Sequence, residues 1–323
     1  MGPALCLLSA ACFGAMAIFG KLAYDDGVSS GSLLLVRFAL AAVLLGVVLL
    51  VRPALRRAGS EAAPGRSAVT RRRALATAVG LGAIGYATQA GLFFSALRLM
   101  DASLLALVLY TYPVLVTVAA VLLGRDRLTP ARGTALVAAS AGTLLVLLGA
   151  GAVSFHPLGA LMAFGAAITY TGYILVADTV VRRLAPVVLS ALVMTGAAGT
   201  LAVIALSTGG IDLDFGRSGW FWLACIAVVS TVVAMLTFFA GLRRTGPSTA
   251  AILSTFEPVV TATLAGLVLG ETLTTVQFVG AALVLSSVGA LQLRRGTTPT
   301  RIRDQDRGHR PAAERAEPAT LAS

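Results

Sequence analysis

Charged side chains are scarce in this chain. Of its 323 residues only 12% are Asp, Glu, Lys or Arg, whereas 57% are hydrophobic. Soluble domains carry about 25% charged residues, and the mean hydropathy of this chain is +0.89. These values exclude a soluble globular protein. We therefore predict an all-α polytopic membrane protein that lies mostly within lipid.

Cysteine, histidine and catalytic motifs are equally sparse. Cys6, Cys12 and Cys225 lie in apolar runs without a CxxC pair, which indicates small buried hydrophobes. His156 and His309 do not have metal-ligand spacing, and the sequence contains no phosphate-cradling glycine loop or nucleophile motif. We expect no metal, no cofactor and no catalytic residue. The missing nucleotide-binding motif also argues against a primary pump in this chain.

The basic residues indicate membrane topology rather than nucleic-acid binding. The formal net charge is +11, and the arginines sit between apolar runs. If the N-terminus is inside, most loop arginines fall on the inner side, and only Lys21, Arg98 and Arg217 lie outside. Cytoplasmic loops carry the excess of Lys and Arg. We predict a multi-pass protein of the cytoplasmic (inner) membrane with both termini in the cytoplasm.

Ten apolar stretches are each long enough for a membrane helix, which needs about 20 residues. They cover residues 3–23, 31–51, 74–97, 102–123, 131–150, 157–178, 186–207, 219–241, 248–269 and 274–293. The first stretch lacks the positive region and cleavage site of a signal peptide, so it is interpreted as a helix. The basic loop 52–73 and the tail 296–323 contain few large apolar residues and are predicted to be flexible and disordered, respectively.

The chain repeats itself. The segment "FFSALRLMDASLLA" from Phe93 aligns with "FFAGLRRTGPSTAA" from Phe238 at an offset of 145 residues, and the same offset brings Pro113 onto Pro258. Fixed-period similarity of this kind marks internal repeats. We assign the first repeat to residues 1–150.

The second repeat covers residues 151–295, and residues 296–323 form the cytoplasmic tail. Each repeat has five predicted spans, and an odd number places the second copy upside down in the membrane. The loop "GRDRL" of the first copy is basic, whereas its counterpart "GETL" is not, which agrees with opposite sides. Inverted repeats are typical of secondary transporters with a substrate site near the midplane.

Several sequence elements carry a family resemblance. A first apolar helix ending in "GK", "RF" early in the second span, a proline in the fourth span and "RLT…G…G" make up one half. "FEPVVTATLAGLVLGETLT…VG" belongs to the other. Over residues 4–293 the chain resembles EamA-type members of the drug/metabolite transporter superfamily. The resemblance implies a ten-helix inner-membrane transporter of two inverted five-helix repeats. It also implies a central cavity among helices 1–4 and 6–9, with helices 5 and 10 peripheral.

Glu257, in "STFEPVV", is the principal candidate site residue. We place it roughly 14 Å into its span, where a carboxylate facing lipid would be costly, so it should face protein or water. Ser254 and Thr261, at i−3 and i+4, are expected to share its face. Pro258 cannot donate a backbone hydrogen bond, which frees the carbonyl of Ser254 and permits a kink. Glu257 is then either a proton- or substrate-responsive group in a cavity or a structural latch.

The equivalent kink in the first repeat is predicted at Pro113, where Tyr112 takes the place of the glutamate. Arg37 lies within the second span and could pair with Glu257, bind another interior partner or extend outward to the membrane surface. Lys21 is either an interfacial anchor or a counter-charge for an anionic substrate group.

Polar side chains also lie on two further spans. Tyr86 and Gln89 share one face of the third span, and Tyr170 and Tyr173 are spaced i, i+3 in the sixth. Such residues either line a pathway or join helices by hydrogen bonds.

Taken together, these features favour a secondary transporter that works by alternating access. The resemblance implies export of a small metabolite, amino acid or drug-like compound, and both proton coupling and facilitated diffusion stay open. The alternatives are a transporter-like sensor or assembly subunit and a membrane-embedded enzyme, for which no convergent cluster of His, Asp or Ser is seen. The expected partners are membrane lipid, a small-molecule substrate and possible coupled protons, but no nucleic acid; a homodimer is left open.

Overall fold

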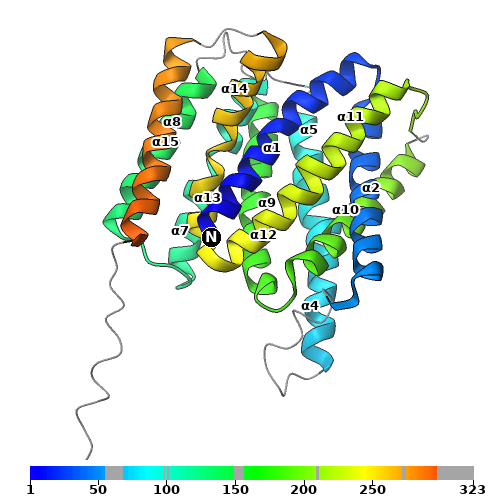
Figure 1. The fold of residues 1–323 in the computed structure, drawn as a ribbon, viewed down its shortest axis with the longest axis horizontal. Coiled ribbons are helices and arrows are strands. Elements are labelled where there is room, and N and C mark those ends of the chain that lie inside the picture. Colours follow the sequence, from blue (N-terminus) through cyan, green and yellow to red (C-terminus); the bar gives the residue numbers. More distant parts are fainter. Residues whose placement is uncertain are drawn as a thin grey trace, which may run out of the picture.

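The computed structural model of the chain describes residues 1–54, 68–97, 99, 102–148, 156–208, 211–270 and 274–296. Within these ranges every regular element is a helix, and the helices form one bundle (Figure 1). The prediction of an all-α protein is thus confirmed.

The predicted loop 52–73 and tail 296–323 fall mostly outside the described residues. Residues 68–73, however, are helical rather than part of the loop, because consecutive arginines are good helix formers and extend the helix beyond its apolar part.

The first half of the bundle is built from the following segments, in which η marks a π-helix. They are α1 (Gly2–Asp25), α2 (Ser30–Val51), α4 (Ala68–Gly80), η1 (Leu81–Tyr86), α5 (Ala87–Leu97), α6 (Ala102–Leu109), α7 (Tyr112–Leu122) and α8 (Pro130–Leu148).

The second half contains the corresponding segments in the same order. They are α9 (Pro157–Val181), α10 (Pro186–Ser207), α11 (Arg217–Ala227), η2 (Val228–Val233), α12 (Ala234–Thr245), α13 (Pro247–Ser254), α14 (Glu257–Leu269) and α15 (Thr275–Gly296).

Local sequence explains where several helices begin and end. The Ser29 hydroxyl caps α2 by accepting a hydrogen bond from the Ser32 backbone nitrogen at 3.2 Å. Proline occupies the first turn of α9, α10 and α13, where its missing N–H costs nothing. Gly246 and Gly270 end α12 and α14 with φ of 80° and 69°, a conformation that favours glycine.

The lengths and compositions of the helices suit a membrane. In the part of the chain that is described, seven helices are long and apolar enough to cross a bilayer. They are Gly2–Asp25, Ser30–Val51, Pro130–Leu148, Pro157–Val181, Pro186–Ser207, Arg217–Thr245 and Pro247–Leu269. Tyr112–Leu122 and Thr275–Ser287 are shorter apolar helices. The polytopic membrane fold is supported, and the count of ten crossings stays a prediction.

The two halves are interrupted at equivalent places. A non-helical pair, residues 110–111, separates α6 from α7, and the pair 255–256 separates α13 from α14 at the offset of 145 residues found in the sequence. The π-helical segments also correspond. η2 begins at Val228, 147 residues after the start of η1 at Leu81, which is close to the repeat offset of 145 residues. π-helical turns inside α-helices are rare and often accompany functional sites. The repeat thus extends to the irregularities of the backbone.

Helices α8 and α15 lie side by side at one edge of the bundle (Figure 1). They cross closely, since a Cβ added to Gly142 would lie 2.7 Å from the backbone oxygen of Gly280. Small residues of this kind let membrane helices approach each other. Their position matches the peripheral place that the family resemblance implies for helices 5 and 10.

Candidate functional site

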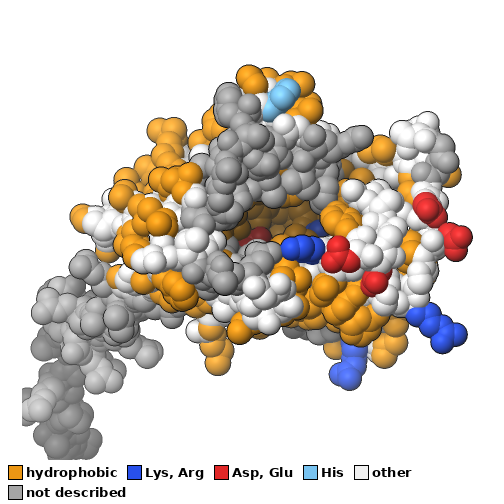
Figure 2. All heavy atoms as spheres, turned by 90° about the horizontal axis from the view of Figure 1, so that it is seen from above, with side chains coloured by type: hydrophobic (Ala, Val, Ile, Leu, Met, Phe, Trp, Pro, Cys, Tyr) orange, Lys and Arg blue, Asp and Glu red, His pale blue; other side chains and the backbone are white. Residues whose placement is uncertain are grey.

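A cavity of about 560 Å³ lies at the centre of the bundle. Its lining comes from both halves, from α1 and α2 through to α14 and the start of α15. Its mouth lies at the end of the bundle where α1 ends and α15 begins, because the lining there includes Lys21, Tyr24 and Gln277. Figure 2 looks onto this end, which is hollowed, with acidic and basic side chains near the opening.

The cavity brings together nine of the ten residues predicted for a substrate or proton pathway. These are Lys21, Arg37, Tyr86, Gln89, Tyr112, Tyr170, Tyr173, Glu257 and Thr261. They come from six segments that are far apart in the sequence: α1, α2, the η1–α5 helix, α7, α9 and α14. Their convergence is a property of the fold, and their role in transport stays a proposal.

Ser254 is the exception. Its side chain is 6% exposed and is absent from the described lining, and its hydroxyl donates to the backbone oxygen of Ala250 at 3.0 Å. The expectation that Ser254 shares a face with Glu257 assumed an unbroken helix. Because residues 255–256 are not helical, the i−3 spacing does not carry across the break.

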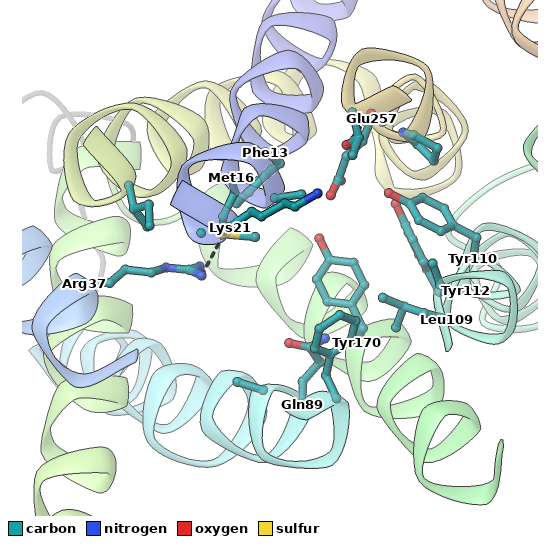
Figure 3. A pocket seen from close by; sticks show the side chains of 18 of the residues that line it. Phe13, Met16, Lys21, Arg37, Gln89, Leu109, Tyr110, Tyr112, Tyr170 and Glu257 are labelled. Atoms are coloured by element: carbon teal, nitrogen blue, oxygen red, sulfur yellow. Dashed lines mark hydrogen bonds between the residues drawn. The ribbon is translucent and has the colours of Figure 1, made fainter. Parts of the chain in front are cut away.

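All six tyrosines of the chain line this one cavity. Sequence reasoning did not select Tyr24 or Tyr110. Tyr110 is two residues before Tyr112, a spacing that points to different faces of a continuous helix. The break at residues 110–111 removes that constraint, and both side chains face the cavity (Figure 3). The signal available in the sequence was Pro113, soon after Tyr110 and directly after Tyr112, because a proline interrupts the helix that precedes it.

Aromatic rings form a continuous series along the cavity wall. The Tyr86 ring meets Phe38 edge-on with centroids 5.1 Å apart and stacks on Tyr173 at 5.6 Å. Tyr173 stacks on Tyr170 at 5.9 Å, and Tyr170 contacts Tyr112 edge-on at 4.8 Å. Such pairs hold one another in fixed orientations. The series connects α2 through η1 and α9 to α7, and thus runs across the cavity.

Glu257 lies at one end of this series. It is the first residue of α14, directly after the break, and is partly buried. A carboxylate at a helix N-terminus is favoured by the helix dipole. The Tyr110 hydroxyl lies near this carboxylate, and Figure 3 shows the two side chains facing each other.

Helix α1 is held tightly against Glu257. A Cβ added to Gly14 would lie 2.8 Å from the backbone oxygen of Glu257, so the crossing has no room for a side chain. Thr261 adds a hydrogen bond from its hydroxyl to the backbone oxygen of Gly14, at 3.0 Å. The position of Glu257 therefore depends on a close contact between the two repeats.

Arg37 lies at the other end of the aromatic series and is 4% exposed. Its guanidinium donates to the Tyr86 hydroxyl at 2.9 Å and to the Met16 sulfur at 2.8 Å. Its Nε is buried without a partner among the described residues. Of the alternatives considered for Arg37, the structure has the interior partner, not a direct ion pair with Glu257 and not an outward extension.

The opposite end of the bundle is closed. Every residue of α13 is buried there, and the hydroxyl of Ser9 on α1 donates to the backbone oxygen of Ala234 at 2.8 Å. At the same end, Arg125 donates to the backbone oxygen of Leu175 at 2.6 Å, and Asp178 forms an ion pair with Arg182. The cavity is therefore a pocket with one mouth rather than a pore.

No group of three or more His, Cys, Asp or Glu in the described ranges could hold a metal ion. His156 has a structural role, because its Nδ1 accepts a hydrogen bond from the Gly159 backbone nitrogen at 3.3 Å and caps α9. The cavity itself offers charged groups, hydroxyl groups and aromatic faces that can bind a ligand.

Comparison with known proteins agrees with this architecture. The profile described as "EamA-like transporter family" matches residues 1–148 and again residues 157–291. "Uncharacterized transporter YcbK" of Bacillus subtilis (strain 168) is 27% identical over 302 residues, which cover 91% of this chain and 93% of that protein. An "Uncharacterized transporter" of Archaeoglobus fulgidus is 36% identical over 77 residues, or 24% of this chain and 28% of its own length.

A solved structure described as "Crystal structure of protein" shares the fold. Its TM-score is 0.73 at 19% sequence identity, and the match covers 92% of this chain and 99% of that one. At this level of identity the likeness concerns the fold alone.

Proposed function

Because the chain belongs to the EamA-like transporter family, we propose that it is a secondary transporter that moves a small molecule across the cytoplasmic membrane by alternating access. The observation that carries this proposal is the central cavity of about 560 Å³, which is closed at one end of the bundle. Cavities of this size bind small molecules. A binding site accessible from one side at a time is what alternating access requires.

The topology that we propose is ten crossings in two inverted repeats, with both termini in the cytoplasm. The loop arginines favour this orientation, and the matched helix breaks at residues 110–111 and 255–256 support the repeat. In this orientation the mouth of the cavity, marked by Lys21, faces the outside. The structure then corresponds to an outward-open state.

The repeats also suggest the opposite state. Helix α13 is entirely buried at the closed end, whereas Ala106 and Leu109 of its counterpart α6 line the open cavity. If α6 became buried and α13 came to line the cavity, the outer end would close and the inner end would open. This change is expected for inverted repeats that rock around a fixed site. In this scheme the breaks before Tyr112 and Glu257 are the hinges.

Glu257 is our candidate for the group that responds to protons or substrate. It lines the cavity, and its counterpart in the first repeat is Tyr112, so the charge is not needed for the shared break. Protonation of Glu257 from outside and release of that proton inside, in exchange for substrate, would produce export.

The test is flux in proteoliposomes. The purified full chain is reconstituted with a mixture of amino acids and other small metabolites inside, and release is followed by mass spectrometry under imposed proton and solute gradients. Ala262 lines the cavity, whereas Val268 on the same helix is 54% exposed away from it. We expect Ala262→Trp to stop release and Val268→Trp to leave it unchanged. If no solute is released under any gradient, the transport proposal is wrong.

A further inference from the structure

The π-helical segment η1 ends at Tyr86, the residue that holds Arg37 in the cavity wall. The Tyr86 hydroxyl accepts a hydrogen bond from Arg37 at 2.9 Å, and its ring contacts both Phe38 and Tyr173. A π-helical turn contains one residue more than an α-helical turn. Because successive residues of a helix are about 100° apart around its axis, this extra residue decides whether Tyr86 faces the cavity or a neighbouring helix.

The π-helical turn takes a backbone partner away from Ala83. In an α-helix the Ala87 N–H would bond to the Ala83 oxygen. Here the Ala87 N–H bonds instead to the backbone oxygens of Gly82 and Ile84. The Ala83 oxygen accepts a hydrogen bond of 2.9 Å from the hydroxyl of Thr200, which lies on α10, 117 positions away in the sequence. Thr200 thus provides a donor in the place of Ala87.

The second π-helical segment carries a hydroxyl donor of its own. In η2, Thr231 donates within the same helix to the backbone oxygen of Ile226 at 2.9 Å. The sequence of η1, "LGAIGY", contains no Ser or Thr, so a donor of this kind has to come from another helix. A carbonyl without a partner inside a membrane bundle is costly, because the bilayer core offers no water. This cost makes η1 dependent on α10.

Helix α10 packs closely against the beginning of η1. A Cβ on Gly82 would overlap the backbone of Val193, and a Cβ on Gly196 would overlap the backbone of Val79. Thr200 lies one turn beyond Gly196 on the same face of α10. No residue of α10 belongs to the described lining of the cavity. Helix α10 therefore fixes the beginning of η1 while it stays outside the cavity.

We propose that Thr200 is a positioning residue of the transport site. Its hydroxyl stabilises the π-helical turn, the turn sets the direction of the Tyr86 side chain, and Tyr86 orients the Arg37 guanidinium. Without the hydroxyl the turn relaxes toward an α-helix. Because the beginning of η1 is fixed on α10, the rotation falls on Tyr86 and α5 and turns Gln89 away from the cavity that it lines. This inference rests on the proposed function, since the site that Thr200 positions is that of the proposed transporter.

Labelling of a cysteine on α5 measures this rotation. The purified full chain with Gln89→Cys is treated with a water-soluble maleimide, and the labelled peptide that contains position 89 is quantified by mass spectrometry, so the native cysteines can stay. A buried acceptor that loses its partner shifts an equilibrium at least about fivefold. We therefore expect Thr200→Val to slow labelling at least about fivefold, and Thr200→Ser, which keeps a hydroxyl, to label at the wild-type rate.

Thr195 of α10 gives the matched control. Its hydroxyl donates to the backbone oxygen of Ala191 within α10 at 2.8 Å, so Thr195→Val should leave the labelling rate unchanged. If Thr200→Val does not fold, Thr200→Ala removes the same hydroxyl with a smaller side chain. Labelling of the folded Thr200 variant at the wild-type rate would overturn the proposal.

A double-mutant cycle separates positioning from general destabilisation. Tyr86→Phe keeps the ring and removes only the hydroxyl that holds Arg37. If Thr200 acts through Tyr86, flux in proteoliposomes should fall less in the double variant than the product of the two single losses. Thr195→Val should add no loss to that of Tyr86→Phe. Losses for Thr200→Val and Tyr86→Phe that simply multiply would show that Thr200 does not act through Tyr86.

Failure of this inference can be told apart from failure of the transport proposal, because labelling does not depend on flux. If labelling changes as expected but no solute crosses the proteoliposome membrane, the positioning role stands and the transport proposal is wrong. If solutes cross and Thr200→Val is labelled and transports like Thr195→Val, transport stands and the positioning role is wrong.

Discussion

Replacing Gly14 with alanine tests how closely α1 is held against Glu257. The new Cβ would lie 2.8 Å from the backbone oxygen of Glu257 and 2.9 Å from the Cβ of Val260. Favourable contacts between carbon atoms begin at about 3.5 Å. Neither neighbour is the free end of a flexible side chain, so the two helices must separate by about half an ångström. The separation also stretches the hydrogen bond of 3.0 Å from Thr261 to the Gly14 oxygen.

The expected cost follows from this geometry. Overpacking at a close contact destabilises by about 1–3 kcal/mol, and alanine in place of glycine inside a helix returns up to about 1 kcal/mol. Gly46 lies inside α2, five residues before its end, and does not line the cavity, and a Cβ added there would meet no other part of the molecule within 4 Å. Gly46→Ala gains the same helix preference without the clash. Gly14→Ala should therefore be less stable than Gly46→Ala by about 1–3 kcal/mol.

Thermal unfolding of the two variants in the same detergent, followed by tryptophan fluorescence, measures this difference. Reconstituted Gly14→Ala should also transport more slowly, because the displaced helix moves the backbone of Glu257. Gly46→Ala should match the wild type in flux. If Gly14→Ala unfolds at the same temperature as Gly46→Ala and transports at the wild-type rate, the close contact between α1 and α14 does not position the site.

Two further substitutions test the same region. Glu257→Gln should keep the fold but remove the pH dependence of flux, measured with the pH varied separately on each side of the membrane; an unchanged profile would exclude Glu257 from coupling. Thr261→Val loses the hydrogen bond to Gly14, whereas the hydrogen bond that Thr263 makes among the described residues stays within its own helix, to the backbone oxygen of Val259 at 2.8 Å. Thr261→Val should thus be less stable than Thr263→Val by about 0.6 kcal/mol, and equal unfolding midpoints would contradict this.

The all-α membrane fold was predictable from the sequence because each apolar stretch can be recognised by itself, without knowledge of its tertiary contacts. Long apolar stretches require only composition and spacing, and the repeat is visible in Pro113 and Pro258. The orientation inferred from the loop arginines stays a prediction. The π-helical segments were not predictable, because "LGAIGY" and "VVSTVV" carry no residue that specifies an extra residue per turn. In the first of these segments a Cβ on Gly82 would clash with the backbone oxygen of Val193 on α10, a tertiary contact that the local sequence does not reveal.

The candidate site was predictable where a residue type alone was informative. An ionisable group within a membrane span must face the interior, which identified Arg37 and Glu257. Residues next to the helix breaks were harder to place, since regular helical spacing put Ser254 on the face of Glu257 and gave no reason to select Tyr110, whereas the described lining contains Tyr110 and not Ser254. The partner of Arg37 was also undetermined, because the Tyr86 hydroxyl reaches it only in the folded bundle, where α10 packs against both α2 and η1.

The placement of all six tyrosines around one cavity gives the protein an internal optical reporter. Both tryptophans, Trp220 and Trp222, are outside the described lining of the cavity, on α11. Tyrosine absorbance and emission therefore report on the binding site, and selectively excited tryptophan reports on the end of the bundle. Reagents that nitrate or iodinate phenols are directed to the same space. Protection of tyrosines from such reagents would reveal an occupied cavity without any label or cysteine substitution, whatever the chemical identity of the ligand.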